Sequence, residues 1–356
     1  MTCSQTPSRY RVTWRAPLLA PLLTALLAAA TLGCARSTVA TAATPAPAAD
    51  RAPAGVRERE LTLGSGDWKV GATLSMPKGT GPFPGVVLIP GSGPADRDLS
   101  VGPNKVFREI AWGLAQRGVA VLRFDKRTRA HEAQFSARGR PASLDEEFTE
   151  DATAAVRALL ASPEIDRRAV YVLGHSQGTL IAPLVATRIP EVRGVVLVSA
   201  AGRPTADLIE EQVRYVSSLA PNDTGARQGA REMMAGVAAM RDPATPDSAT
   251  VLGRSMRYWR DVDAIHPIDL VGALVARGGR ALVVHGGRDY LVTDADFARW
   301  KGAFGADSLV TLRRYDALNH LMQAGVGRMR PEEYGERRPV DDAFLADLAR
   351  WLRAGR

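Results

Sequence analysis

The stretch that decides how this chain folds is Gly174-His175-Ser176-Gln177-Gly178. It follows the apolar, β-branched run Ala169-Val170-Tyr171-Val172-Leu173 and precedes a helix-like run from Thr179 to Ala186. A strand, a Gly-x-Ser-x-Gly turn and a helix in this order are the layout of a nucleophile elbow. The sequence therefore predicts a sharp turn between strand and helix with Ser176 at its tip.

The physics of such an elbow explains its two glycines. The serine holds a strained backbone conformation so that its hydroxyl stands clear of the sheet. Strand and helix then almost touch, and a Cβ at Gly174 or Gly178 would clash. The N-terminus of the helix directs N–H groups and its dipole at any negative charge that forms beside Ser176. The alternative is a Gly-rich turn with a solvated serine, and the flanking strand and helix favour the elbow.

Length and composition bound the architecture and the partners. The chain has 356 residues and 46% apolar content, enough for one large α/β domain with an insertion or for two modest domains. The net charge of +8 comes mostly from scattered arginines, with no stripe of basic and aromatic residues, which argues against nucleic-acid binding. No metal or cofactor is implied, because no His, Asp and Glu grouping has metal-ligand spacing and no glycine loop has the dinucleotide or P-loop pattern.

Both cysteines, Cys3 and Cys34, lie near the start of the chain. The body of the protein therefore has no disulfide, no cysteine nucleophile and no thiolate metal site.

Residues 1–35 have the pattern of an export signal. Basic residues precede an apolar run from Ala16 to Leu32, and small residues end it. The run is marginally short for a spanning helix, and no apolar stretch of that length follows it. We therefore expect export to the periplasm or cell envelope.

The end of the signal predicts how the protein is held there. Thr31-Leu32-Gly33-Cys34 resembles a bacterial lipobox, which favours a lipid anchor on Cys34 over plain secretion with cleavage near Ala35. Residues 36–55 are rich in Ala, Thr and Pro and are expected to form a tether. Any contact with a membrane is expected only through this anchor.

From residue 56 to residue 356 the chain alternates between strand and helix patterns. The strands are short and fully apolar, which is typical of a mostly parallel sheet covered by helices on both faces. Residues 203–265 break the alternation with helical patterns only, and we expect them to form a lid over the carboxyl edge of the sheet. Residues 129–143 are polar and loop-like. The predicted strands span residues 56–63, 68–74, 86–89, 119–124, 169–173, 195–199, 281–285 and 308–315, and the predicted helices 105–117, 144–160, 179–186, 294–304 and 341–352.

A serine hydroxyl is a poor nucleophile until a histidine, oriented by a carboxylate, takes its proton. On such a sheet these partners lie on loops after later strands, in the order Ser, acid, His. Of the five histidines, His320 follows the last predicted strand and is the candidate base. The others are His131 in a polar loop, His175 inside the elbow, His266 at the exit of the lid beside the expected pocket, and His285 at the end of a strand, where it is expected to bond locally.

Asp289 is the candidate acid. It lies in the turn after the buried strand 281–285, and the chain between it and His320 has room for one helix and one strand. The remaining candidates are Asp294, expected to cap the next helix, Asp296, and Asp316 as runner-up.

Stabilising a developing oxyanion needs two converging N–H groups. One is expected from Gln177, the residue after the nucleophile, and the other from Ser92 or Gly93 in the loop after the third strand. A charged cluster beside this loop is expected to hold it by ion pairs. The cluster comprises Asp96, Arg97, Asp98, Asp125, Lys126 and Arg127.

On these motifs the chain resembles the α/β-hydrolase superfamily. Gly91-Ser92-Gly93-Pro94-Ala95-Asp96-Arg97-Asp98 and Leu122-Arg123-Phe124-Asp125-Lys126-Arg127 are similar to a bacterial group of secreted or cell-associated carboxylesterases and serine-aminopeptidase-like hydrolases. The resemblance covers the chain from Val56 onward, apart from the lid. It departs at Thr128, where this group usually has Gly. It implies an α/β-hydrolase fold, a triad of Ser176, Asp289 and His320, and an oxyanion hole from Ser92 and Gln177.

The expected function is a cofactor-free serine hydrolase that cleaves small carboxylic esters through an acyl-enzyme. An aminopeptidase or amidase of the same fold is the nearest alternative, and no acidic residue for a free substrate amine is identified. A second alternative, from a different class, is an inactive envelope lipoprotein that keeps the fold for binding.

Overall fold

The computed structural model describes residues 51–355. The predicted export signal, the lipobox residue Cys34 and the tether up to residue 50 lie outside the described residues. Between residues 51 and 355, no helix is both long and apolar enough to cross a membrane.

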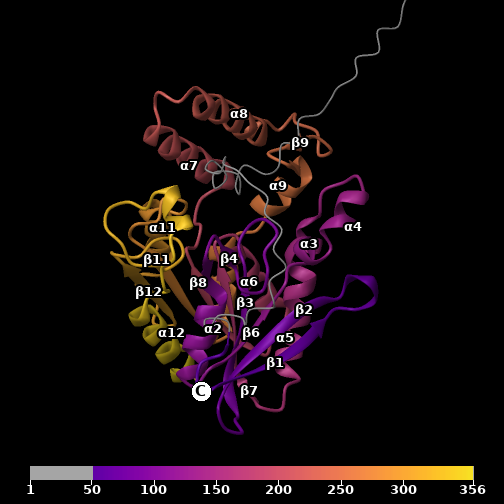
Figure 1. The fold of residues 1–356 in the computed structure, drawn as a ribbon, viewed down its shortest axis with the longest axis vertical. Helices are drawn as coiled ribbons and strands as arrows, with labels where there is room; N and C mark the ends of the chain where they lie inside the picture. The colour runs from indigo at the N-terminus through magenta and orange to yellow at the C-terminus, as the bar shows by residue number, and fades with distance from the viewer. Residues whose placement is uncertain (1–50, 356) are drawn as a thin grey trace, which may run out of the picture.

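An eight-stranded sheet in the order β1-β2-β6-β3-β7-β8-β11-β12 forms the centre of the molecule (Figure 1). The antiparallel hairpin β1–β2 pairs antiparallel with β6, and every other neighbouring pair is parallel. The mostly parallel sheet predicted from the sequence is confirmed. Its strands are β1 (Val56–Leu63), β2 (Val70–Pro77), β3 (Phe83–Ile89), β6 (Ala120–Phe124), β7 (Ile165–His175), β8 (Val192–Val198), β11 (Arg280–Gly286) and β12 (Val310–Tyr315).

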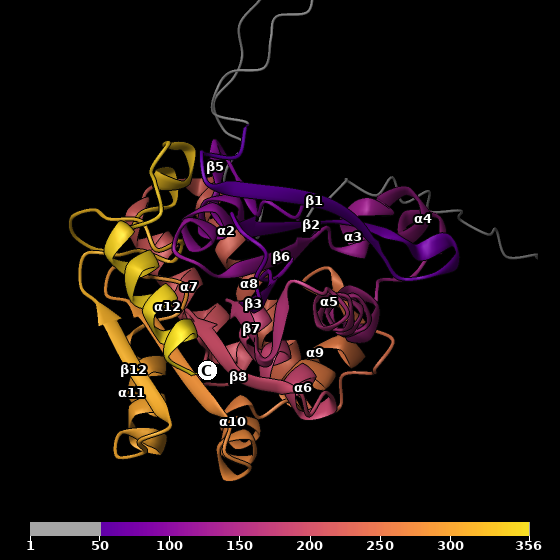
Figure 2. The same ribbon diagram turned by 90° about the horizontal axis from the view of Figure 1, so that it is seen from below.

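Helices cover both faces of the sheet. Successive side chains of a strand point to opposite faces, and in the central strands the side chains on both faces are apolar. On β3, Val86 and Leu88 pack on one face with helices α2 (Val106–Gln116) and α12 (Asp342–Ala354). Val87 and Ile89 pack on the other. Figure 2 shows the two layers on either side of the strands. The second layer consists of α5 (Glu150–Leu160), α6 (Gly178–Arg188), α10 (Pro267–Ala276) and α11 (Asp294–Phe304).

Between β8 and α10 the chain forms an insertion that lies above the carboxyl edge of the sheet (Figure 1). It contains α7 (Thr205–Leu219), α8 (Thr224–Arg241), the two-stranded hairpin β9 (Thr250–Val251) and β10 (Arg254–Ser255), and α9 (Met256–Asp263). The prediction that no strand interrupts this segment is wrong. The hairpin turns through Leu252 and Gly253, both at positive φ, and strands of two residues are too short to show an alternating pattern.

The polar segment 129–143, predicted as a loop, is partly helical. It contains the end of α3 (Arg127–Ala130) and all of α4 (Glu132–Ala137). Phe135 on α4 packs against Trp68 with ring centroids 5.0 Å apart, so a contact distant in sequence stabilises helices that the local pattern does not favour. The remaining short elements are β4 (Ser100–Val101), β5 (Asn104–Lys105), η2 (Gly66–Trp68), η3 (Asp145–Thr149), a π-helical turn that leads into α5, and η4 (Pro331–Gly335).

Candidate active site

Ser176 lies at the tip of the turn between β7 and α6, with φ at 54°. A serine in this left-handed region is strained, as expected for an elbow. A Cβ on Gly174 would lie 2.1 Å from the carbonyl oxygen of Gly178, and a Cβ on Gly178 would lie 2.4 Å from that of Ile89. Neither position can therefore hold a larger residue without moving the backbone.

Asp289 and His320 are joined by a hydrogen bond of 2.7 Å between Oδ2 and Nδ1, and both side chains are buried. The second oxygen of Asp289 accepts the N–H groups of Leu291 and Val292 at 2.8 and 3.1 Å. Burial alone would raise the pKa of Asp289, but His320 and these two N–H groups outweigh it and hold the pKa below its ordinary value. Because the carboxylate accepts the proton on Nδ1, Nε2 is the basic nitrogen of the His320 ring.

The loop that carries His320 is fixed to the elbow through its main chain. The carbonyl oxygen of His320 accepts Nε2–H of His175 at 2.9 Å and the hydroxyl of Ser199 at 3.3 Å. The rings of His175 and His320 lie 4.7 Å apart. Since His175 directly precedes Ser176, these bonds hold the loop of the predicted base against the end of the strand that leads to the predicted nucleophile.

His175 and Ser199 both hold the loop that carries His320, a role that the sequence did not predict for either residue. Burial, with a smaller effect from His320, lowers the pKa of His175 to about 3, so its ring is neutral and can donate only through one nitrogen. Ser199 is fully buried, follows β8 and has φ at 55°. The position of His175 inside the elbow was a usable signal, whereas nothing in the sequence distinguishes Ser199 from any serine after a strand.

The loop after β3 passes directly against Ser176. A Cβ on Gly91 would lie 3.0 Å from the Cβ of Ser176, and Gly93 has φ at 81°. The main-chain N–H groups of Ser92 and Gln177 donate to no acceptor within residues 51–355. Of the two predicted oxyanion donors, Gln177 therefore follows Ser176 in the chain and Ser92 belongs to the loop that lies against it. Both N–H groups are free to bind a substrate oxygen.

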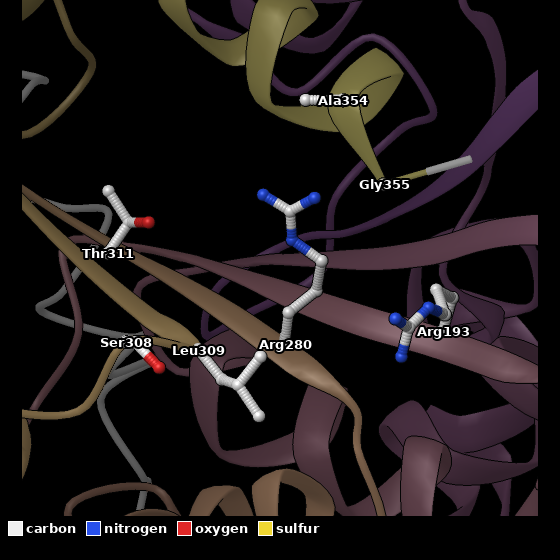
Figure 3. A pocket seen from close by; sticks show the side chains of 7 residues that line it. All are labelled: Arg193, Arg280, Ser308, Leu309, Thr311, Ala354 and Gly355. Carbon is white, nitrogen blue, oxygen red and sulfur yellow. The ribbon is translucent and has the colours of Figure 1, made fainter.

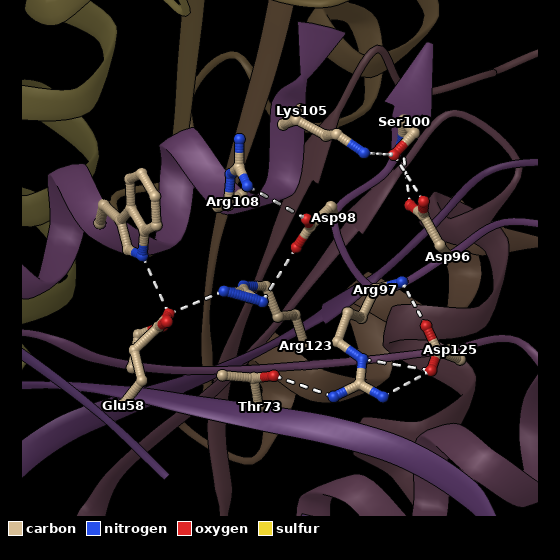
Figure 4. A network of polar contacts seen from close by, with 12 residues as sticks. Glu58, Thr73, Asp96, Arg97, Asp98, Ser100, Lys105, Arg108, Arg123 and Asp125 are labelled. Carbon is tan, nitrogen blue, oxygen red and sulfur yellow. Dashed lines mark hydrogen bonds and ion pairs between the residues drawn. The ribbon is translucent and has the colours of Figure 1, made fainter. Parts of the chain in front are cut away.

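The predicted ion pairs beside this loop are present, although within the cluster only Arg97 and Asp125 pair with each other (Figure 4). The guanidinium of Arg97 lies 2.7 Å from Asp125, whose other oxygen accepts the Arg97 main-chain N–H at 2.8 Å. Asp98 binds Arg123 at 3.0 Å, and Arg123 also binds Glu58 on β1 at 2.7 Å. The loop after β3, which carries the predicted oxyanion donor Ser92, is thus tied to the β1–β2–β6 side of the sheet.

The other histidines lie elsewhere or serve local structure. His285 binds Asp294 at 3.1 Å and stacks on Phe297, as predicted for a locally bonded residue. His131 is half-buried, with its ring nitrogen 2.8 Å from the carbonyl oxygen of Lys69. His266 is exposed and precedes α10, so the expectation that it lies at the pocket finds no support.

The other acidic candidates are also accounted for. The prediction that Asp294 caps α11 is wrong, because Thr293 is the N-cap and forms a capping box with Asp296. Asp294 instead binds Arg314 at 2.7 Å. Asp316 is exposed and pairs with the same arginine, whereas Asp289 binds Nδ1 of His320.

A cavity of about 190 Å³ lies at the amino ends of β8 and β11 (Figure 3). Arg193, Arg280 and the end of α12 line it. It lies at the opposite edge of the sheet from Ser176, which follows the carboxyl end of β7, and so does not belong to the candidate site. In the part of the chain that the structure describes, no three His, Cys, Asp or Glu side chains gather as a metal ion would require.

The comparisons with known proteins agree with this geometry. The family described as serine aminopeptidase, S33, matches residues 104–324. The esterase EstD of Thermotoga maritima is 35% identical over 302 residues, which cover 84% of this chain and 68% of that protein.

Solved esterases share the fold at low identity. Est1E from Butyrivibrio proteoclasticus superposes with a TM-score of 0.53 at 17% identity, covering 83% of this chain and 98% of that one. The esterase domain of a Rhodothermus marinus protein superposes with a TM-score of 0.50 at 19% identity, covering 84% and 98%. The solved structures show the α/β-hydrolase fold, and the family match and the relative from Thermotoga show that the chain belongs to the serine aminopeptidase S33 family and is a hydrolase of the esterase type.

Proposed function

We propose that this chain is a serine hydrolase that cleaves carboxylic esters through an acyl-enzyme intermediate. The observation that carries the proposal is the buried Asp289–His320 pair, fixed through the His320 carbonyl to the residue before a strained Ser176. The similarity to an esterase along most of both chains supports the ester as substrate class.

In the proposed reaction, the Ser176 hydroxyl attacks the carbonyl carbon of the ester while Nε2 of His320 takes its proton. The carbonyl oxygen becomes an oxyanion, held by the N–H groups of Ser92 and Gln177. Collapse of the tetrahedral intermediate breaks the ester bond, and His320 returns the proton to the departing alcohol. Water then attacks the acyl-serine by the same route and releases the acid. Asp289 keeps the His320 ring oriented and stabilises its charged form.

The experiment compares the purified protein with Ser176→Ala on p-nitrophenyl acetate, butyrate and octanoate. We expect kcat/KM to fall by ~10³-fold or more in the variant, because the nucleophile is lost while the oxyanion donors remain. Equal rates for the two proteins would refute the proposal. The chain-length profile reports the size of the acyl pocket.

The same assay separates the alternatives. The family's description names an aminopeptidase, so amino-acid p-nitroanilides are tested beside the esters. Serine-dependent turnover of anilides at a higher kcat/KM than of esters would replace the esterase by the aminopeptidase. No turnover of either and no labelling of Ser176 by a fluorophosphonate would instead favour a binding protein.

We also propose that the protein is exported and anchored in the cell envelope through a lipid on Cys34. The basic and apolar pattern of residues 1–35 and the lipobox-like end of this segment support the proposal. Fractionation of cells that express the full chain and Cys34→Ser tests it. We expect the unchanged chain in the membrane fraction and the variant outside it, and the same fraction for both would contradict the anchor.

A further inference from the structure

Lys126 is buried directly behind the oxyanion loop, with 1% of its side chain exposed. Its ammonium group donates to the carbonyl oxygen of Gly91 at 3.0 Å and to Glu147 at 2.7 Å, and it lies 3.6 Å from the ring centre of Phe148. These contacts satisfy the ammonium group in three directions. A charge-assisted hydrogen bond therefore fixes the peptide carbonyl that immediately precedes Ser92.

Glu147, on the π-helical turn η3, connects this lysine to the lid. Its carboxylate is fully buried and lies 2.9 Å from Arg254 of β10, whose guanidinium lies over the ring of Tyr258 on α9. Burial would raise the pKa of Glu147, but Lys126 and Arg254 outweigh it and lower the pKa below its ordinary value, so the group is a carboxylate. The lid thus binds a charge in the body of the domain through Arg254.

Tyr258 connects the lid to Gln177, the residue that follows Ser176. Its hydroxyl oxygen accepts Nε2–H of Gln177 at 3.0 Å, and its ring lies under the guanidinium of Arg254 at 5.0 Å. The tyrosine is buried. A continuous chain of contacts therefore runs from Gly91 through Lys126, Glu147, Arg254 and Tyr258 to Gln177.

We propose that Lys126, Glu147 and Tyr258 are positioning residues that set the two halves of the oxyanion hole at their working distance. Because Tyr258 and its neighbour Arg254 belong to the lid, the hole is complete only when the lid is docked on Glu147. The inference rests on the proposed function, since an oxyanion hole matters only to an enzyme that forms an oxyanion. None of the three residues touches the reacting atoms.

The test is Tyr258→Phe, which removes one oxygen and leaves the ring that packs against Trp259. We expect kcat on the acetate ester to fall ~10-fold, a fraction of the loss seen when an oxyanion donor is removed outright, with KM within ~2-fold of its original value. The affinity for a trifluoromethyl ketone, which forms an oxyanion on the serine, should fall by the same factor as kcat. A purely structural role would lower the melting temperature without this matched loss.

The matched control is Tyr215→Phe. Tyr215 is also a lid tyrosine, but its hydroxyl donates to the carbonyl oxygen of Met329, away from the oxyanion loop, at 2.8 Å. Its kcat and inhibitor affinity should stay within ~2-fold of the unchanged protein, since it removes the same group elsewhere on the lid.

The contact can also be cut from its other end with Gln177→Met, which keeps the main-chain N–H and removes the side-chain donor to Tyr258. This variant should lose the same factor, and the double variant with Tyr258→Phe should lose no more than either alone. Unchanged kcat and inhibitor affinity in both single variants would overturn the inference, and so would additive losses in the double variant. In either case, serine-dependent hydrolysis by the unchanged protein would still uphold the proposed function. No serine-dependent hydrolysis by the unchanged protein would overturn both.

Discussion

The neutral ring of His175 makes the folded protein sensitive to acid. The ring is buried, and Nε2–H is committed to the carbonyl of His320, while Nδ1 has no partner among residues 51–355. The pKa of His175 falls from 6.5 to about 3 on folding. Between these two values the unfolded chain binds a proton that the folded protein excludes, so stability rises with pH and is lost as the pH falls.

The size of this effect follows from the shift. Each pH unit inside the window costs about 1.4 kcal/mol of unfolding free energy for a single proton. From pH 7.5 to pH 4.5, His175 alone should cost about 3 kcal/mol, most of it below pH 6.5. His175→Gln removes the titrating ring and places an amide N–H where it can reach the same carbonyl. The variant should therefore lose less stability than the unchanged protein over this range.

Urea unfolding of both proteins at pH 7.5, 6.0 and 4.5 measures the difference, and carboxylates that titrate in both proteins cancel. The unfolding free energy of the variant, relative to the unchanged protein, should rise by about 3 kcal/mol from the highest to the lowest pH. A difference that stays constant within about 0.5 kcal/mol would show that His175 titrates normally in the folded protein, and the argument from burial would fail.

Two further substitutions test the site and the elbow. Asp289→Asn should lower kcat ~10⁴-fold on the acetate ester with little change in KM, because an amide no longer holds His320 in the tautomer that leaves Nε2 basic; a loss under tenfold would contradict this role. Gly178→Ala should cost more than ~3 kcal/mol of unfolding free energy, since the new Cβ would lie 2.4 Å from the Ile89 carbonyl oxygen. Its control is Gly272→Ala in the α10 helix, where nothing lies within 4 Å of the new Cβ; thermal unfolding should show a gain of about 0.5–1 kcal/mol, and equal effects at the two glycines would contradict the steric argument.

The parts of the fold that the sequence predicts are those with a local physical signature. The central residues of β3 and β7, 86–89 and 169–173, are continuous apolar runs because both of their faces are covered, and a run of that kind is visible without knowing its neighbours. The glycines around Ser176 are visible because only a residue without a Cβ fits against the adjacent backbone. The motif of the elbow predicts the order of Ser176, Asp289 and His320, and a parallel sheet brings the ends of the strands before them to one edge.

The parts that escaped prediction depend on contacts between distant segments. Glu147 is an ordinary acidic residue in an acidic stretch until the fold buries it against Lys126 and Arg254. Tyr258 lies in a segment whose only local signal is helical. The misplaced cap of α11 has another cause, because Thr293 and Asp294 are neighbours that can both cap a helix, and one residue of offset lies below the resolution of a sequence pattern.

The contacts of Arg254 with Glu147 and of Tyr258 with Gln177 also limit how this enzyme can diversify. In a fold whose insertion does not contact the catalytic loops, a new lid can change the substrate specificity and leave the rate constant of the chemical step unchanged. Here the insertion carries two of the groups that hold the loops on either side of the serine in place. A lid transplanted from a relative would therefore bring a new pocket and an altered oxyanion hole together, unless the graft retained an arginine and a tyrosine at these two positions.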